Sequence, residues 1–186
     1  MELKRTVWMA QTRLMRQFYC CVLVCGLLVV SGHAADEGVK TTIKSEPVLK
    51  FAIDIVDATG DPPMIVIWVE RTDGAFVKTL QMLSKDKKYY PDITAWETAR
   101  NGKEKQADFD AVVGATIKWG QSRELIVPIT SGGVNLLAGN LVLRIEQRKD
   151  KGGHYRKRKI PLTSDWPGVT LEKEGYIKKM TVTVTR

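Results

Sequence analysis

Hydrophobic and polar residues alternate along much of the chain after residue 46, and this pattern predicts β-strands. Residues 49–55 place an apolar side chain at every second position, so we expect a strand with one buried face. Residues 64–69 are apolar without a break, which is typical of a strand covered on both faces. The Asp-Gly pair at 73–74 then predicts a hairpin that returns through residues 75–83.

The strand pattern resumes after Gly120, with Gly-rich turns between short apolar runs. The candidate strands cover residues 125–129, 141–145, 155–162, 169–171 and 177–184. Together with the first group this makes about seven or eight strands, a number typical of β-sandwiches. The sequence therefore predicts a mostly β fold, an antiparallel immunoglobulin-like sandwich, with a small barrel as the nearest alternative.

One short helix is expected between the two groups of strands. Asp92 can cap its start, and Ile93 and Trp96 lie on one face. Asn101 and Gly102 supply a stop signal.

The N-terminus has the layout of a secretory signal peptide. Four basic residues precede an apolar run at 18–30, and small residues follow it up to Ala34. The run is about thirteen residues, short of the roughly 20 that span a bilayer, so we expect cleavage after Ala34 and no permanent membrane anchor. A start at Met1, Met9 or Met15 gives the same mature chain.

The domain organisation follows from this processing. Residues 1–34 are the predicted signal peptide, residues 35–46 a polar, flexible leader, and residues 47–186 a single β-sandwich domain. All three cysteines lie in the apolar run, so the mature chain has no disulfide. It keeps 25 Lys and Arg against 20 Asp and Glu. In an exported protein this excess indicates weak attraction to envelope polyanions rather than binding to nucleic acid.

Several segments resemble one family. The run IVIWVERTDGAFVKTL at 65–80, Pro91-Asp92-Ile93 with Trp96, and residues 110–116 are similar to DUF2271, a family of predicted periplasmic proteins. The resemblance covers most of the mature chain. It differs at 131–133, where relatives often carry Trp-Asp-Gly and this chain has Ser-Gly-Gly. It implies a periplasmic location and a sandwich fold, and no particular activity.

The segment Asp110-Ala111-Val112-Val113-Gly114-Ala115-Thr116 is similar to the flavin-acceptor motif of exported electron carriers. The resemblance implies that FMN is esterified to Thr116, with Asp110, Gly114 and Ala115 completing the motif. Small residues leave room for a transferase and for the phosphate. Val113 occupies a position where the motif prefers Ser or Thr. A structural interpretation, in which residues 113–115 bend into a strand and Asp110 caps the turn, is favoured for so short a motif.

Other candidate chemistry has less support. The mature chain has one histidine, His154, in a predicted surface turn, which excludes His-based metal clusters and Ser-His-Asp catalysis. Asp108 and Asp110 could share a cation, or act in hydrolysis of envelope material, but other ligands in register are lacking.

Two further groups have a structural and a functional interpretation. The basic residues at 156–159 are better explained as protection of an edge strand than as a patch for anionic lipid or glycan. Trp68 and Trp96 are assigned to the core. Trp119 and Trp166 are the more exposed candidates for a carbohydrate platform.

Two hypotheses follow. The first is a non-enzymatic binding or accessory module that acts through its surface on a periplasmic or membrane protein, without a cofactor. The alternative is a redox protein that carries FMN on Thr116 and works beside a membrane electron-transfer component. Thr116 separates them, because it must be accessible in the second and is merely structural in the first.

Overall fold

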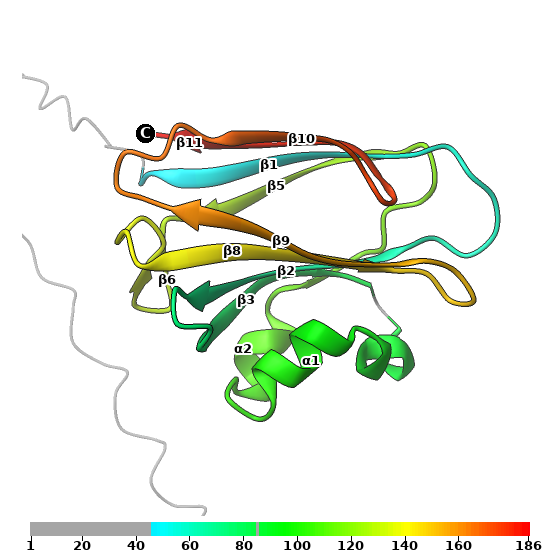
Figure 1. Ribbon diagram of the computed structural model, residues 1–186, viewed down its shortest axis with the longest axis horizontal. Helices are drawn as coiled ribbons and strands as arrows, with labels where there is room; N and C mark the ends of the chain where they lie inside the picture. Colours follow the sequence, from blue (N-terminus) through cyan, green and yellow to red (C-terminus); the bar gives the residue numbers. More distant parts are fainter. Residues whose placement is uncertain (1–45, 85) are drawn as a thin grey trace, which may run out of the picture. The chain divides into compact units, whose positions relative to one another are not determined.

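The computed structural model describes residues 46–84 and 86–186. The predicted signal peptide at 1–34 and all but the last residue of the predicted leader lie outside the described residues. In the described part the chain is mostly β, with antiparallel sheets and three short helical segments (Figure 1).

Four strands form one sheet, called sheet A, in the order β10-β11-β1-β5. Its strands are β1 (Val48–Ile55), β5 (Ser122–Pro128), β10 (Val169–Glu174) and β11 (Ile177–Thr185). The predicted alternation is confirmed in β1, where Leu49, Phe51 and Ile53 are completely buried. The residues between them form the outer face of the sheet, which the helices do not cover (Figure 1).

Five strands form the second sheet, called sheet B, in the order β4-β3-β2-β8-β9. Its strands are β2 (Met64–Arg71), β3 (Phe76–Leu83), β4 (Val113–Gly114), β8 (Leu141–Arg148) and β9 (His154–Leu162). All pairs are antiparallel except β3 with the two-residue β4. A small separate hairpin joins β6 (Thr130–Ser131) to β7 (Val134–Asn135).

The inner faces of the two sheets share a hydrophobic core. Phe51 and Val182 from sheet A lie in one buried cluster with Ile67 and Leu143 from sheet B. The sheets therefore pack face to face, as the two strand layers in Figure 1 show.

The helical segments cover the other face of sheet B. They are η1 (Lys87–Asp92), α1 (Thr94–Arg100) and α2 (Gln106–Asp110). A second buried cluster lies between them and the sheet, and it joins Val66 and Trp68 of β2 to Tyr90, Trp96 and Phe109. The prediction that β2 is covered on both faces is thus confirmed.

The expectation of a single helix was wrong. α1 lies where it was expected, with Asn101 at its C-cap, but η1 and α2 are additional. α2 has only five residues and one buried side chain, Phe109, so it is too short to show a helical period in the sequence.

The cap of α1 also differs from the prediction. Asp92 is the last residue of η1, and Ile93 holds the N-cap position without a side-chain hydrogen bond. The backbone amides of Ala95 and Trp96 donate instead to the carboxylate of Glu146 in β8, at 3.2 and 2.8 Å. This cap comes from a residue about fifty positions away, so no local signal predicts it. Within the described residues, no helix is long and apolar enough to cross a membrane.

Candidate functional site

The segment 110–116 links the helices to the edge of sheet B. Asp110 ends α2, and Val113 and Gly114 form β4, the edge strand beside β3. The Val112 carbonyl accepts a 3.0 Å hydrogen bond from the Met82 amide. Phe109 before the segment is buried in the helix-side core, and Ile117 after it is buried between the sheets. Both ends of the segment are therefore anchored in hydrophobic cores.

The structural interpretation expected Asp110 to cap a turn, but it does not. Its exposed carboxylate accepts hydrogen bonds from Gln106 Nε2 at 2.9 Å and Lys87 Nζ at 3.2 Å. The hydrogen bond from Gln106, followed by that from Lys87, lowers the pKa of Asp110 below its usual value. The carboxylate is thus ionised and ties α2 to η1, and within the described residues it makes no hydrogen bond to Gly114, Ala115 or Thr116.

Gly114 lies close to the side chain of Gln81. A Cβ atom at this position would lie 2.6 Å from the side-chain nitrogen of Gln81. A larger residue here would make the flexible end of the Gln81 side chain move aside, while glycine leaves room beside the segment.

Thr116 lies in the irregular segment between β4 and β5 and is half-buried. Within the described residues no group forms a hydrogen bond with its hydroxyl. The guanidinium of Arg123, in β5, donates a 2.6 Å hydrogen bond to the carbonyl oxygen of Ala115, the residue before it. The site thus combines a hydroxyl that bonds to no described residue with a guanidinium held on the backbone carbonyl of the preceding residue.

Arg123 is a site residue that sequence reasoning missed. It lies in the other sheet, and only the packing of β5 beside the segment after β4 brings it to Ala115. A guanidinium carries five N–H donors and suits phosphate well, and the bond to Ala115 uses one of them.

The acidic pair of the sequence analysis is not assembled into a cation site. Asp108 is exposed on α2, and Asp110 is bonded to Gln106 and Lys87. In the described part of the chain, no three His, Cys, Asp or Glu side chains come together in a way that could hold a metal ion.

The expectation that His154 is a surface turn residue was wrong. It begins β9, its side chain is largely buried, and its Nε2 contacts the completely buried carboxylate of Glu146. The contact links β9 to the residue that caps α1. It fastens the helices to sheet B.

The two tryptophans that were expected to be exposed differ from one another. Trp166 is only 8 % exposed and belongs to the core between the sheets, so that prediction was wrong. Trp119 is half-buried at the margin of this core. Its indole N–H donates to the Gly60 carbonyl at 2.9 Å.

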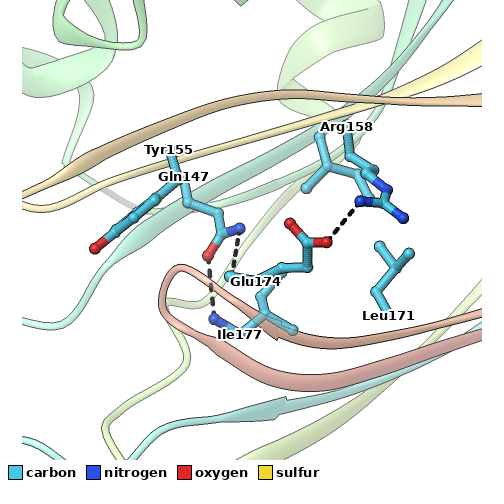
Figure 2. A pocket seen from close by; sticks show the side chains of 7 residues that line it. Gln147, Tyr155, Arg158, Leu171, Glu174 and Ile177 are labelled. Carbon is cyan, nitrogen blue, oxygen red and sulfur yellow. Dashed lines mark hydrogen bonds and ion pairs between the residues drawn. The ribbon is translucent and has the colours of Figure 1, made fainter.

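A small cavity lies between the open edges of the sheets, at β9 and β10 (Figure 2). Its volume is about 30 Å³, and its lining includes Tyr155 and the ion pair between Arg158 and Glu174, at 2.7 Å. The Gln147 side chain joins the sheets here through bonds to the Glu174 carbonyl and to the Tyr176 and Ile177 amides. A cavity of this size has room for about one water molecule and not for a flavin or a sugar.

The basic group at 156–159 lies on β9, which is an edge strand of sheet B. The side chains of Arg156 and Lys157 lie outside the described residues. The Arg158 side chain pairs with Glu174 of β10 and so bridges the two sheets.

Comparison with known proteins gives one match. No curated protein and no solved structure is significantly similar to the chain. The model of one family, described as a predicted periplasmic protein, matches residues 47–179, which include every strand except the end of β11. The expected periplasmic location is confirmed by that description. The chain therefore belongs to the DUF2271 family of predicted periplasmic proteins.

Proposed function

We propose that this chain is a non-enzymatic carrier module of the periplasm, which holds FMN covalently on Thr116 and exchanges electrons with a protein partner. The observation that carries the proposal is the Thr116 hydroxyl. It lies in a segment anchored at both ends and forms no hydrogen bond with any described residue. Its oxygen is not among the buried side-chain atoms that lack a partner, so it keeps contact with solvent, as the acceptor of a transferred group must.

Attachment requires a flavin transferase and FAD as the flavin donor. A bond forms between Thr116 Oγ and the phosphorus of the FMN half of FAD. The phosphorus–oxygen bond to the AMP half breaks, AMP leaves, and the hydroxyl proton is released. Gly114 and Ala115 favour this reaction because they place little bulk beside the acceptor.

Arg123 fits the product of this reaction. The phosphodiester keeps one negative charge, and the guanidinium is fixed on the Ala115 carbonyl next to Thr116. An arginine can bind two phosphate oxygens at once, so Arg123 would orient the linkage. When bound, FMN supplies the electron transfer itself, and the protein supplies its position and electrostatics.

Val113 departs from the motif, which prefers Ser or Thr at this position. Val113 pairs with Met82 through the backbone, and its side chain packs against the helix-side core. Strand pairing and packing therefore fix the backbone at Val113.

A second candidate function is a binding or accessory module that acts through its surface without a cofactor. The specific observation in its favour is the uncovered outer face of sheet A, where the Ile126 side chain is 63 % exposed. Two face-to-face antiparallel sheets support an immunoglobulin-like sandwich, a fold that often hosts recognition. The partner in either case is an unidentified periplasmic or membrane protein, and for the flavin carrier a membrane electron-transfer component.

The test is co-expression of the full chain with a periplasmic flavin transferase, followed by denaturing electrophoresis and in-gel flavin fluorescence. The wild type and Thr116→Ser should show a fluorescent band, because both keep a hydroxyl, and Thr116→Ala should not. Thr181→Ala on sheet A is the matched control and should stay fluorescent.

Arg123 refines this test. Arg123→Lys keeps a positive charge and should be labelled more than Arg123→Gln. A wild-type chain without fluorescence, alongside a known acceptor that is labelled in the same cells, would refute the flavin proposal and favour the second candidate.

A further inference from the structure

Three aromatic side chains line up at one end of the two sheets. Trp119 lies in the turn before β5, Tyr176 in the turn between β10 and β11, and Tyr155 near the start of β9. The ring centroids of Trp119 and Tyr176 are 5.6 Å apart, and those of Tyr176 and Tyr155 are 5.0 Å apart. We call these three residues the aromatic strip. Figure 1 shows the three segments at the end where the β1–β2 loop turns.

The backbone holds the strip rigidly. A Cβ atom at Gly175 would lie 2.5 Å from the Tyr155 ring, so this ring rests directly on glycine backbone. The Tyr176 hydroxyl donates to the Gly153 carbonyl at 3.0 Å. With the indole bond of Trp119 to Gly60, each ring therefore has a fixed position before any ligand arrives.

The strip is nevertheless accessible to solvent. Tyr155 is 45 % exposed, and Trp119 and Tyr176 are half-buried. In Figure 2 the Tyr155 ring lies to one side of the cavity with its hydroxyl pointing away from Arg158. Rigid aromatic rings that remain exposed are typical of binding surfaces, because they offer apolar contact area at low entropic cost.

A positive charge accompanies the strip. The Lys149 ammonium lies 5.1 Å from the Trp119 ring centroid. It also donates to the Thr59 carbonyl at 3.2 Å, which restrains it there. A planar ring that becomes more negative on reduction would be stabilised in its reduced form by this lysine.

The flavin that Thr116 carries in the proposed function is such a ring. Trp119 lies three positions after Thr116, and a chain of three residues spans at most about 11 Å. The cavity between β9 and β10 is too small for a flavin, whereas the strip offers a group tethered at Thr116 an aromatic surface within short reach.

We propose that the aromatic strip receives the isoalloxazine ring of FMN carried on Thr116, and that Lys149 raises its reduction potential. This inference rests on the proposed function. It assigns Trp119, Tyr176 and Tyr155 as the flavin-contacting residues and Lys149 as the residue that adjusts its electronics.

The experiment uses the full chain loaded with FMN by a transferase, and its readout is the flavin fluorescence yield of the folded protein. Contact with tryptophan or tyrosine quenches flavin emission, so the loaded wild type should emit weakly. Trp119→Leu and Tyr155→Leu should each increase the emission several-fold. Tyr89→Leu, which removes an aromatic ring from η1 instead, should leave it unchanged. Tyr155 is the more exposed of the two target residues, so its variant remains informative if Trp119→Leu does not fold.

A second readout concerns the charge. Lys149→Met should lower the midpoint potential of the bound flavin, whereas Lys151→Met, two residues along the same turn, should not. Intact mass distinguishes the two possible failures. A chain that carries FMN but emits as strongly as free flavin, or that responds equally to Tyr155→Leu and Tyr89→Leu, would refute this inference alone. A wild-type chain at its unmodified mass would refute the proposed function and this inference with it.

Discussion

The outer faces of sheet A and sheet B consist of similar antiparallel strands, yet only sheet B is covered by helices. On sheet A the charged residues stay in solvent, as in the pair of Lys50 and Glu124 at 2.7 Å, whose side chains are 41 % and 52 % exposed. On sheet B three charged side chains are buried instead. Glu70 and Arg144 are 6 % and 7 % exposed, and Glu146 is completely buried.

Charged residues therefore have different energetic roles on the two sheets, because they are buried on one and solvated on the other. The Glu70 carboxylate accepts bonds from Trp68 Nε1 at 2.8 Å and from Arg144 at 2.5 Å. Removing such groups from water is costly, so each depends on its partner. The solvated pair on sheet A has no such dependence. Four predictions test this comparison, beginning with the largest effect.

Arg144→Met should destabilise the protein by about 3–5 kcal/mol, because it leaves the Glu70 carboxylate buried without its cation. The double variant Glu70→Leu with Arg144→Met should recover most of this loss, since it removes both charges together. Urea unfolding measures the stability of the single and the double variant. Equal stability of the single and double variants would contradict the claim that the two charges depend on one another.

Thr79→Val should cost about 1–3 kcal/mol. The Thr79 hydroxyl accepts a hydrogen bond from Trp96 Nε1 at 2.9 Å and donates to Glu104 at 2.7 Å, so valine leaves the buried indole N–H unsatisfied. Thr181→Val, on the exposed face of sheet A, is the control and should have almost no effect. A similar loss in both variants would show that the helix cover makes no difference.

Tyr90→Phe should cost about 1 kcal/mol, because it removes the 2.8 Å bond from the buried hydroxyl to the Ser84 carbonyl. Burial raises the pKa of Tyr90, followed in effect by the charges of Asp110 and Asp86. The folded state thus holds this proton more tightly than the unfolded state. The contribution of this proton to the free energy of unfolding is complete below the ordinary tyrosine pKa of about 10. It is lost as pH rises through the higher pKa of Tyr90 in the folded state. Unfolding measured from pH 8 to 11 should therefore show a steeper decline for the wild type than for Tyr90→Phe, and parallel curves would contradict this.

Lys50→Gln on sheet A should change stability by less than about 1 kcal/mol, because the pair with Glu124 is solvated. The effect should disappear in high salt, which screens exposed charges. Thermal unfolding at two salt concentrations measures it. A loss as large as that of Arg144→Met would remove the basis of the comparison.

The inner layers of this fold could be predicted from the sequence because their signals are local. Period-two alternation identifies β1 and β11, and the unbroken apolar run of β2 indicates cover on both faces. The Asp73-Gly74 hairpin is confirmed by the 2.8 Å bond from the Arg71 amide to the Ala75 carbonyl.

The features that could not be predicted depend on contacts between different elements of the fold. Trp166 lies beside Pro167 in a segment whose sequence predicts an exposed turn, yet its side chain is buried in the core between the sheets. His154 is largely buried against the carboxylate of Glu146, which also caps α1. Arg123 reaches Ala115 only across the two sheets. In each case a tertiary contact, rather than a local pattern, determines the environment.

The most direct test of the central claim is mass spectrometry of the tryptic peptide 106–118 from protein made with its own signal beside an active flavin transferase. Cleavage after Lys105 and Lys118 gives QADFDAVVGATIK, in which Thr116 is the only residue with a hydroxyl side chain. The account predicts this peptide with one added FMN, attached to Thr116 on fragmentation. Recovery of the peptide only at its unmodified mass, while a known acceptor in the same cells is modified, would contradict it.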